Sequence, residues 1–329
     1  MNADVTRQSM GATVLTVAAL LVLVAIRSAA APYPTGSLGL VTVPVGHLLA
    51  RFDEAMPTVS KSVALFIFFL NSFLLTRTVT RYLFATRTYL TAVIYTIVAV
   101  GMFLPHPTTV AALVSMTVIR ASELLIRSFQ RGYTFDLVFK GAFLFGLSPL
   151  IYGPAMWLPL ALPLPLLLLR RRWREWITAL AGMLAPLFLF SYGCWATGRP
   201  FLHTLTQITE DTLYNSNYTV FNRATPIPVL VMAGLLTLAL ALAAGSFVSS
   251  ARTLRTRSYK VYMYFLLMLP VSMLPLVFPG RTVIGYSLLA IPCAVLIPYL
   301  FVRRKGALSA AVYLSLVLAC IAANIIPLL

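Results

Sequence analysis

The chain has 329 residues, of which 60% are hydrophobic and only 10% are charged, and its mean hydropathy is +0.91. This composition excludes a water-soluble fold, because so few polar residues cannot cover the apolar remainder. The formal net charge of +17 does not indicate nucleic-acid binding, since the basic residues are spread over many short segments and do not form one surface.

Eleven apolar segments follow one another along the chain. Lipid offers no hydrogen-bond partner to an open backbone, so we expect each segment to be a membrane-spanning helix. The sequence therefore predicts an all-α, polytopic helical bundle that forms a single transmembrane domain over residues 1–329. The expected spans are 12–30, 62–76, 89–105, 108–126, 137–152, 154–169, 176–196, 228–249, 261–278, 283–302 and 307–327.

The distribution of lysine and arginine predicts the orientation of these spans. With a cytoplasmic N-terminus and eleven spans, nineteen of the 25 basic residues fall on the cytoplasmic side, as the positive-inside rule requires. The C-terminus is then outside. The six basic residues on the outer side are Arg27, Arg51, Lys61, Arg199, Arg223 and Arg281.

Residues 137–169 are the weakest part of this assignment. The two apolar segments there are shorter than the roughly 20 residues of a full crossing and are joined only at Gly153. A re-entrant hairpin is the alternative. It would leave nine full spans, with every other loop on the same side.

Two outer loops are long, and each has the pattern of an amphipathic helix lying in the membrane interface. In the first loop the apolar stripe is Val45, Leu48, Leu49, Phe52 and Met56, and we expect His47, Arg51, Asp53 and Glu54 on or beside the polar side. In the second loop a weaker stripe precedes a polar and aromatic segment from Tyr214 to Arg223.

These loops hold all four outward-facing acids, which are the candidate catalytic residues Asp53, Glu54, Glu210 and Asp211. A carboxylate at the outer edge of the membrane could act as a general base on an acceptor hydroxyl, while arginines neutralise a phosphate leaving group. The alternative is that the acids are simply solvated. The candidate substrate-binding residues are Arg51, Arg199, Arg223, Arg281, Tyr214 and Tyr218.

The remaining polar residues indicate structure more than chemistry. Arg120, Glu123 and Arg127 share one helix face and predict a local ion-paired cluster near the cytoplasmic end of a span. Three scattered cysteines and three scattered histidines show no metal-ligand spacing, so we predict neither a metal nor a cofactor.

The stretch from Lys140 through Gly146, Ser148, Pro149 and Tyr152 to Pro154, followed by Arg170 to Trp176, resembles an uncharacterised family of bacterial multipass envelope proteins. The resemblance covers roughly the middle third of the chain and implies a location in the bacterial inner membrane.

A looser architectural similarity exists to membrane glycosyltransferases that use polyprenyl-linked sugars, because Asp53 and Glu54 fall where those enzymes place an acid. It implies a transferase in cell-envelope biogenesis that acts at the outer face on a polyprenyl-phosphate-linked substrate. The alternatives are a non-catalytic scaffold or subunit with an envelope protein as partner and, third, a transporter. In each case membrane lipids are partners and nucleic acid is not.

Overall fold

The computed structural model describes residues 9–30, 43–82, 88–102, 107–129, 134–169, 171–213, 227–250, 254, 256–277, 282–303 and 307–325. These residues form an all-helical bundle, and none of them lies in a strand. Tyr214, Tyr218, Arg223 and Arg281, four of the expected substrate-binding residues, lie outside the described residues.

The helices follow the expected apolar segments closely. In chain order they are α1 (Met10–Ala30), α2 (Pro44–Ala55), α3 (Pro57–Tyr82), α4 (Leu90–Thr96), the π-helix η2 (Ile97–Met102), α5 (Thr109–Arg127), α6 (Phe135–Ile151), the 3₁₀-helix η3 (Gly153–Ala161), α7 (Pro163–Leu168), α8 (Trp173–Ala196), α9 (His203–Leu213), α10 (Ile227–Ser250), α11 (Thr256–Val277), α12 (Gly285–Arg303) and α13 (Ala307–Ile325). The two helices expected in the outer loops are α2 and α9.

Seven of the described helices are long and apolar enough to cross a membrane: α1, α3, α5, α8, α10, α11 and α12. Several of them expose large apolar side chains, such as Leu15 on α1, which is 72% exposed, and Phe188 on α8, which is 59% exposed. An apolar surface of this extent is stable against lipid and not against water. The chain is therefore a membrane protein.

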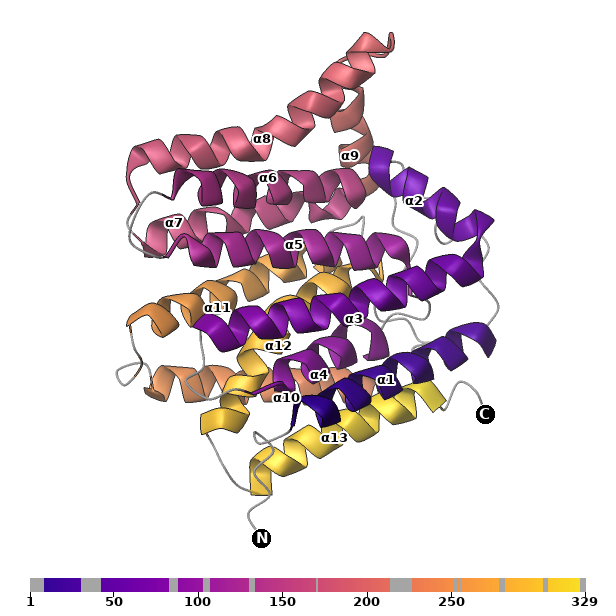
Figure 1. Cartoon of the computed structure of the whole chain (residues 1–329), viewed down its shortest axis with the longest axis vertical. Coiled ribbons are helices and arrows are strands. Elements are labelled where there is room, and N and C mark those ends of the chain that lie inside the picture. Colours follow the sequence, from indigo (N-terminus) through magenta and orange to yellow (C-terminus); the bar gives the residue numbers. More distant parts are fainter. Residues whose placement is uncertain are drawn as a thin grey trace.

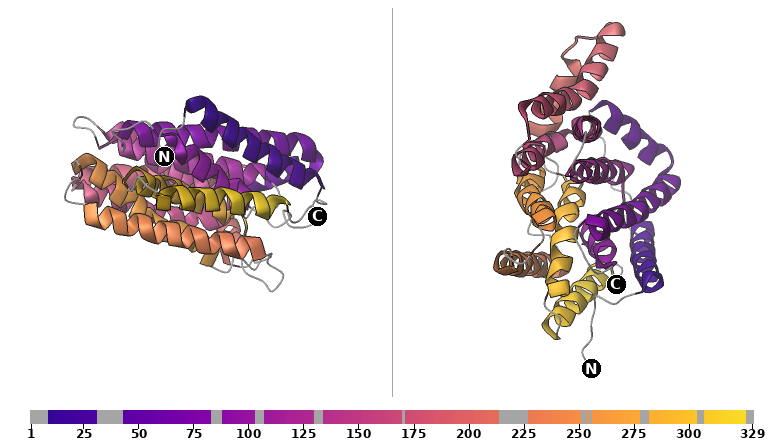
Figure 2. Two further views of the ribbon diagram at one scale, coloured as in Figure 1. Left: turned by 90° about the horizontal axis from the view of Figure 1, so that it is seen from below. Right: turned by 60° about the vertical axis from the view of Figure 1, so that its left-hand side comes forward.

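The helices run roughly side by side, so the bundle has two distinct ends (Figure 1). At one end, drawn on the left, α3, α5 and α12 finish and α8 and α11 begin, and we call it the basic end because arginines gather there. The opposite end carries α2 and α9, and we call it the α2/α9 end. At that end α8 leaves the bundle and, together with α9, forms a projecting corner (Figures 1 and 2).

The centre of the bundle is α12, in which every residue from Gly285 to Phe301 is buried. It packs against α4, α5, α10 and α11. Pro292 and Pro298 lie inside α12. Because the helix is enclosed by neighbours, it contributes almost nothing to the lipid-facing surface.

Close contacts between helices depend on small residues. The pair α6 and α8 meets at Gly146, where an added Cβ would lie 2.0 Å from the carbonyl oxygen of Met183, and at Gly182, where it would lie 2.6 Å from that of Phe139. Glycine at these positions lets the two backbones touch, as in other membrane helix pairs.

Residues 137–169 form two neighbouring arms, α6 and then η3 with α7, joined at Tyr152 (Figure 1). The 17 residues of α6 extend about 26 Å at 1.5 Å per residue. Since a 3₁₀-helix rises about 2.0 Å per residue, η3 and α7 together reach about 27 Å. The second arm thus equals the first in length, although both are slightly shorter than a hydrocarbon core of about 30 Å.

Candidate functional site

The candidate site lies at the α2/α9 end, where the structure describes all four predicted acids. In each adjacent pair one carboxylate is buried and the other is exposed. Asp53 and Asp211 are 0% and 4% exposed, whereas Glu54 and Glu210 are exposed. Residues adjacent on a helix point about 100° apart, so one member of each pair faces the bundle while the other faces away.

Asp53 joins three helices through its carboxylate. Ser60, on α3, donates its hydroxyl to Oδ1, and the hydroxyl of Thr109 donates to the same oxygen at 2.6 Å. The backbone N–H of Thr109 donates to Oδ2 at 3.2 Å. Thr109 is the first residue of α5, so Asp53 satisfies an amide at the helix N-terminus, where a negative charge is also stabilised by the helix dipole.

The expected place of Asp53 on the polar side of its helix is wrong. The buried face of α2 consists of Gly46, Ala50 and Asp53, at spacings i, i+4 and i+7. Small residues let α2 approach the bundle closely, and Asp53 follows them on the same face. Of the apolar stripe, Leu48 and Met56 are instead exposed, at 66% and 55%.

Burial also changes the acidity of Asp53. Desolvation raises the pKa of its carboxyl above the ordinary value, and the hydrogen bonds from Ser60 and Thr109 oppose this only in part. The nearby charge of Glu54 raises the pKa further. The group therefore holds its proton more tightly than an exposed aspartate does.

Asp211 makes the second link at this end. Its Oδ2 accepts a hydrogen bond of 3.1 Å from the backbone N–H of Val43, the residue that precedes α2. Gly153, at the start of η3, packs against it so closely that an added Cβ would lie 2.5 Å from the Cβ of Asp211. Asp211 thus fixes α9 to the beginning of α2, and Asp53 fixes α2 to the beginning of α5.

The exposed charges at this end are Arg51 and Glu54 on α2, Arg199 after α8, and Glu210 on α9. None of the four forms an ion pair with another described residue. Arg51 and Glu54 lie three residues apart and therefore share one face of α2. These side chains are free to meet a ligand from outside the bundle.

The opposite end is organised by paired charges. Glu123 on α5 contacts Arg120 and Arg127, each at 2.5 Å, which confirms the ion-paired cluster expected from their spacing. Arg171 contacts Glu175 on α8 at 3.1 Å and donates to the carbonyl oxygen of Ser128 at the end of α5. These contacts connect α5 and α8.

Sequence reasoning missed the partners of the two aspartates, Ser60 and Thr109 for Asp53 and the Val43 amide for Asp211. One available signal was that Thr108 and Thr109 follow Pro107 directly before an apolar run, a pattern typical of a helix start. Asn71 and Asn324 were missed as well. Asn71 donates to the carbonyl of Ala112 at 3.0 Å, and Asn324 donates to that of Gly101 at 2.7 Å.

Within the described part of the chain, no group of three or more His, Cys, Asp or Glu side chains is arranged to hold a metal ion. The fold and the site together define an all-helical membrane protein whose two amphipathic helices are fixed to one end of the bundle by buried carboxylates. Comparisons with protein families, curated proteins and solved structures found no match.

Proposed function

We propose that this chain is a bacterial inner-membrane protein of cell-envelope biogenesis that acts on a polyprenyl-phosphate-linked substrate at its outer face. The single observation that supports the proposal most is the set of exposed charges at the α2/α9 end. Arg51, Glu54, Arg199 and Glu210 have no ion-pair partner in the described structure, while α2 and α9 are held in place beneath them.

The proposed reaction is transfer of the sugar to a hydroxyl group. The acceptor oxygen bonds to the anomeric carbon while Glu54 or Glu210 takes its proton. The bond from that carbon to the phosphate oxygen breaks, and the polyprenyl phosphate leaves with the electron pair. Arg51 and Arg199 neutralise the charge that develops on the phosphate.

The roles of the four acids differ in this proposal. Asp53 and Asp211 are positioning residues, because their oxygens already accept hydrogen bonds inside the bundle. Glu54 and Glu210 keep the catalytic role that the sequence suggested for the whole set. Tyr214, Tyr218, Arg223 and Arg281 remain proposed substrate contacts.

Native mass spectrometry of the gently purified protein tests the proposal. We expect a retained polyprenyl-phosphate species that is lost in Arg51→Gln/Arg199→Gln. It should remain in Arg172→Gln/Arg174→Gln, a control that removes the same charge from exposed positions at the basic end. In Glu54→Gln/Glu210→Gln we expect the lipid-linked sugar to be retained, because binding survives and transfer does not.

A scaffold for envelope assembly is the second candidate, and the use of Asp53 and Asp211 in packing favours it. Two of the four acids then serve the attachment of α2 and α9, and the exposed charges bind a protein partner. A stoichiometric partner chain in the same spectra, with only bulk phospholipid, would replace the transferase with the scaffold.

A further inference from the structure

Several described basic residues of the basic end have no acid partner, and three of them lie on the neighbouring helices α3 and α11. Each described acid at that end is already engaged: Glu123 by Arg120 and Arg127, Asp136 by Lys140, and Glu175 by Arg171. Arg77 and Arg81 on α3 and Arg257 on α11 contact none of these acids. Three guanidinium groups therefore stay without a negative partner in the described structure.

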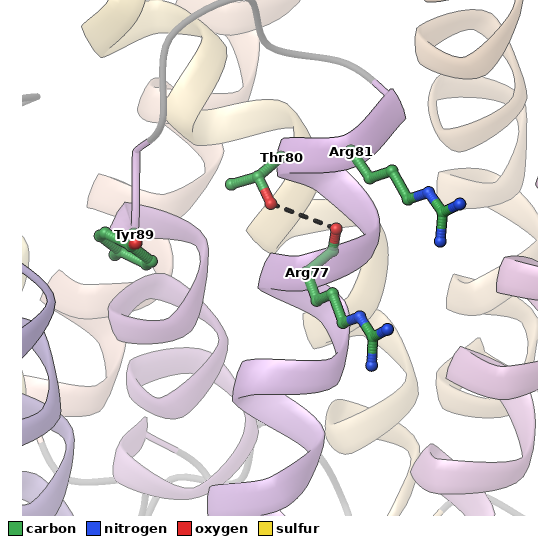
Figure 3. Close-up of a pocket in the computed structure, with 4 residues that line it drawn as sticks. All are labelled: Arg77, Thr80, Arg81 and Tyr89. Carbon is green, nitrogen blue, oxygen red and sulfur yellow. Dashed lines mark hydrogen bonds between the residues drawn. The ribbon is translucent and has the colours of Figure 1, made fainter.

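Two of these arginines contact the same tyrosine, and the third lies one helical turn earlier on α3. Arg77 and Arg81 are four residues apart on the last turns of α3, and their side chains extend in the same direction while Tyr89 lies on the other side of the helix (Figure 3). The guanidinium carbon of Arg81 lies 5.6 Å from the centre of the Tyr82 ring, and that of Arg257 lies 5.1 Å from the same ring. Cation–π contacts with one tyrosine thus bring arginines of α3 and α11 together.

Open space also lies at this end of α3. A cavity of 370 Å³, lined by Arg77, Thr80, Arg81 and Tyr89, lies at this end of α3. That volume falls within the roughly 300–1,000 Å³ of small-ligand sites. Like charges near one another without an acid repel, and an anion bound between them removes the repulsion.

Guanidinium groups bind phosphate oxygens with paired hydrogen bonds, which makes arginine the usual residue for phosphate recognition. Since α3 is long enough to cross the membrane, its terminal arginines lie at the level of the lipid headgroups. We propose that Arg77, Arg81 and Arg257 form a binding site for a phosphate group, supplied either by an anionic lipid headgroup or by a soluble phosphate compound. This site lies at the opposite end of the bundle from the one proposed above and is independent of it.

The test uses the full chain in a non-ionic detergent at constant ionic strength, titrated separately with dihexanoylphosphatidylglycerol and with inorganic phosphate. Binding is followed by thermophoresis. In Arg77→Gln/Arg81→Gln we expect the affinity for the bound probe to fall at least about tenfold, because two charge-assisted interactions are lost. The control Arg172→Gln/Arg174→Gln removes the same charge from exposed positions elsewhere at this end and should change the affinity less than about twofold.

The two probes distinguish the sources of the phosphate group. Saturation by the lipid alone indicates a headgroup site, whereas inorganic phosphate that displaces the lipid indicates a site for a soluble phosphate. Arg257→Gln is a second variant on a different helix. It should lower the affinity for the same probe even if the α3 variant folds poorly. The proposal is overturned if neither probe saturates the wild-type protein, or if the control weakens binding as much as the α3 and α11 variants do.

Discussion

Replacement of Asp53 by alanine should separate α2 from the rest of the bundle. The change removes the acceptor of the Thr109 amide, which as a helix-cap interaction contributes about 1 kcal/mol. It also removes the acceptor of the Ser60 and Thr109 hydroxyls, each about 1 kcal/mol. The two hydroxyls can instead donate to backbone carbonyls of their own helices, which restores part of the lost free energy. The expected decrease in the free energy of unfolding is therefore about 2–3 kcal/mol.

Asp53→Asn should behave differently. The asparagine oxygen can accept from the Thr109 amide, while its NH₂ group donates to the two hydroxyls, which accept as readily as they donate. The buried charge disappears at the same time. We expect Asp53→Asn to unfold within about 1 kcal/mol of the wild-type protein.

The assay is SDS titration of the purified protein in mixed micelles, with helix content followed by circular dichroism. Glu54→Ala is the matched control, because Glu54 is the neighbouring acid, is exposed and forms no described ion pair. It should leave the midpoint unchanged. The proposed role of Asp53 in holding α2 is refuted if Asp53→Ala is as stable as Glu54→Ala, or if Asp53→Asn is as unstable as Asp53→Ala.

Three further predictions concern pH and packing. Because the pKa of Asp53 is raised in the folded protein, its contribution to stability is complete below the pKa of 3.8 in the unfolded chain and is lost as the pH rises through the folded pKa. In SDS titrations across this pH range, the wild-type protein should therefore lose stability relative to Asp53→Asn. Gly146→Ala forces α6 and α8 apart and should lower the free energy of unfolding by about 1–3 kcal/mol in the same assay. The control is Gly193→Ala, whose added Cβ meets nothing within 4 Å and should leave the free energy of unfolding unchanged. Equal effects of the two variants would contradict this prediction. Asn324→Ala removes the hydrogen bond from α13 to the Gly101 carbonyl in η2 and should lower the free energy of unfolding by about 0.6–2 kcal/mol in the same assay. An unchanged midpoint would contradict this prediction.

Much of the fold could be predicted from hydropathy, because an apolar segment in lipid has no stable backbone conformation other than a helix. The described parts of all eleven expected segments are helical, including the shorter ones at residues 90–102 and 153–168. The 3₁₀ winding of η3 was not predictable, since nine residues of that form are unusual and depend on local packing around Pro154 and Pro159.

The candidate site was harder to predict than the fold. An amphipathic helix in the interface has an apolar side for lipid, but α2 also has a small-residue side for protein, and hydrophobicity alone does not distinguish the two. For this reason the sequence placed Asp53 with the exposed charges, whereas Gly46 and Ala50 place it inside. The hydrogen bond from Val43 to Asp211 joins residues 168 apart in the chain, and no local pattern indicates it.

Membrane topology is the most direct test of the central claim, which is that the α2/α9 end faces outward and carries the functional charges. Glu54→Cys and Arg174→Cys are made in a Cys194→Ala background, where the remaining Cys293 and Cys320 are buried. Intact spheroplasts are then treated with a membrane-impermeant maleimide. We expect position 54 to be labelled in intact spheroplasts and position 174 only after permeabilisation. The reverse pattern would contradict an outward-facing α2/α9 end.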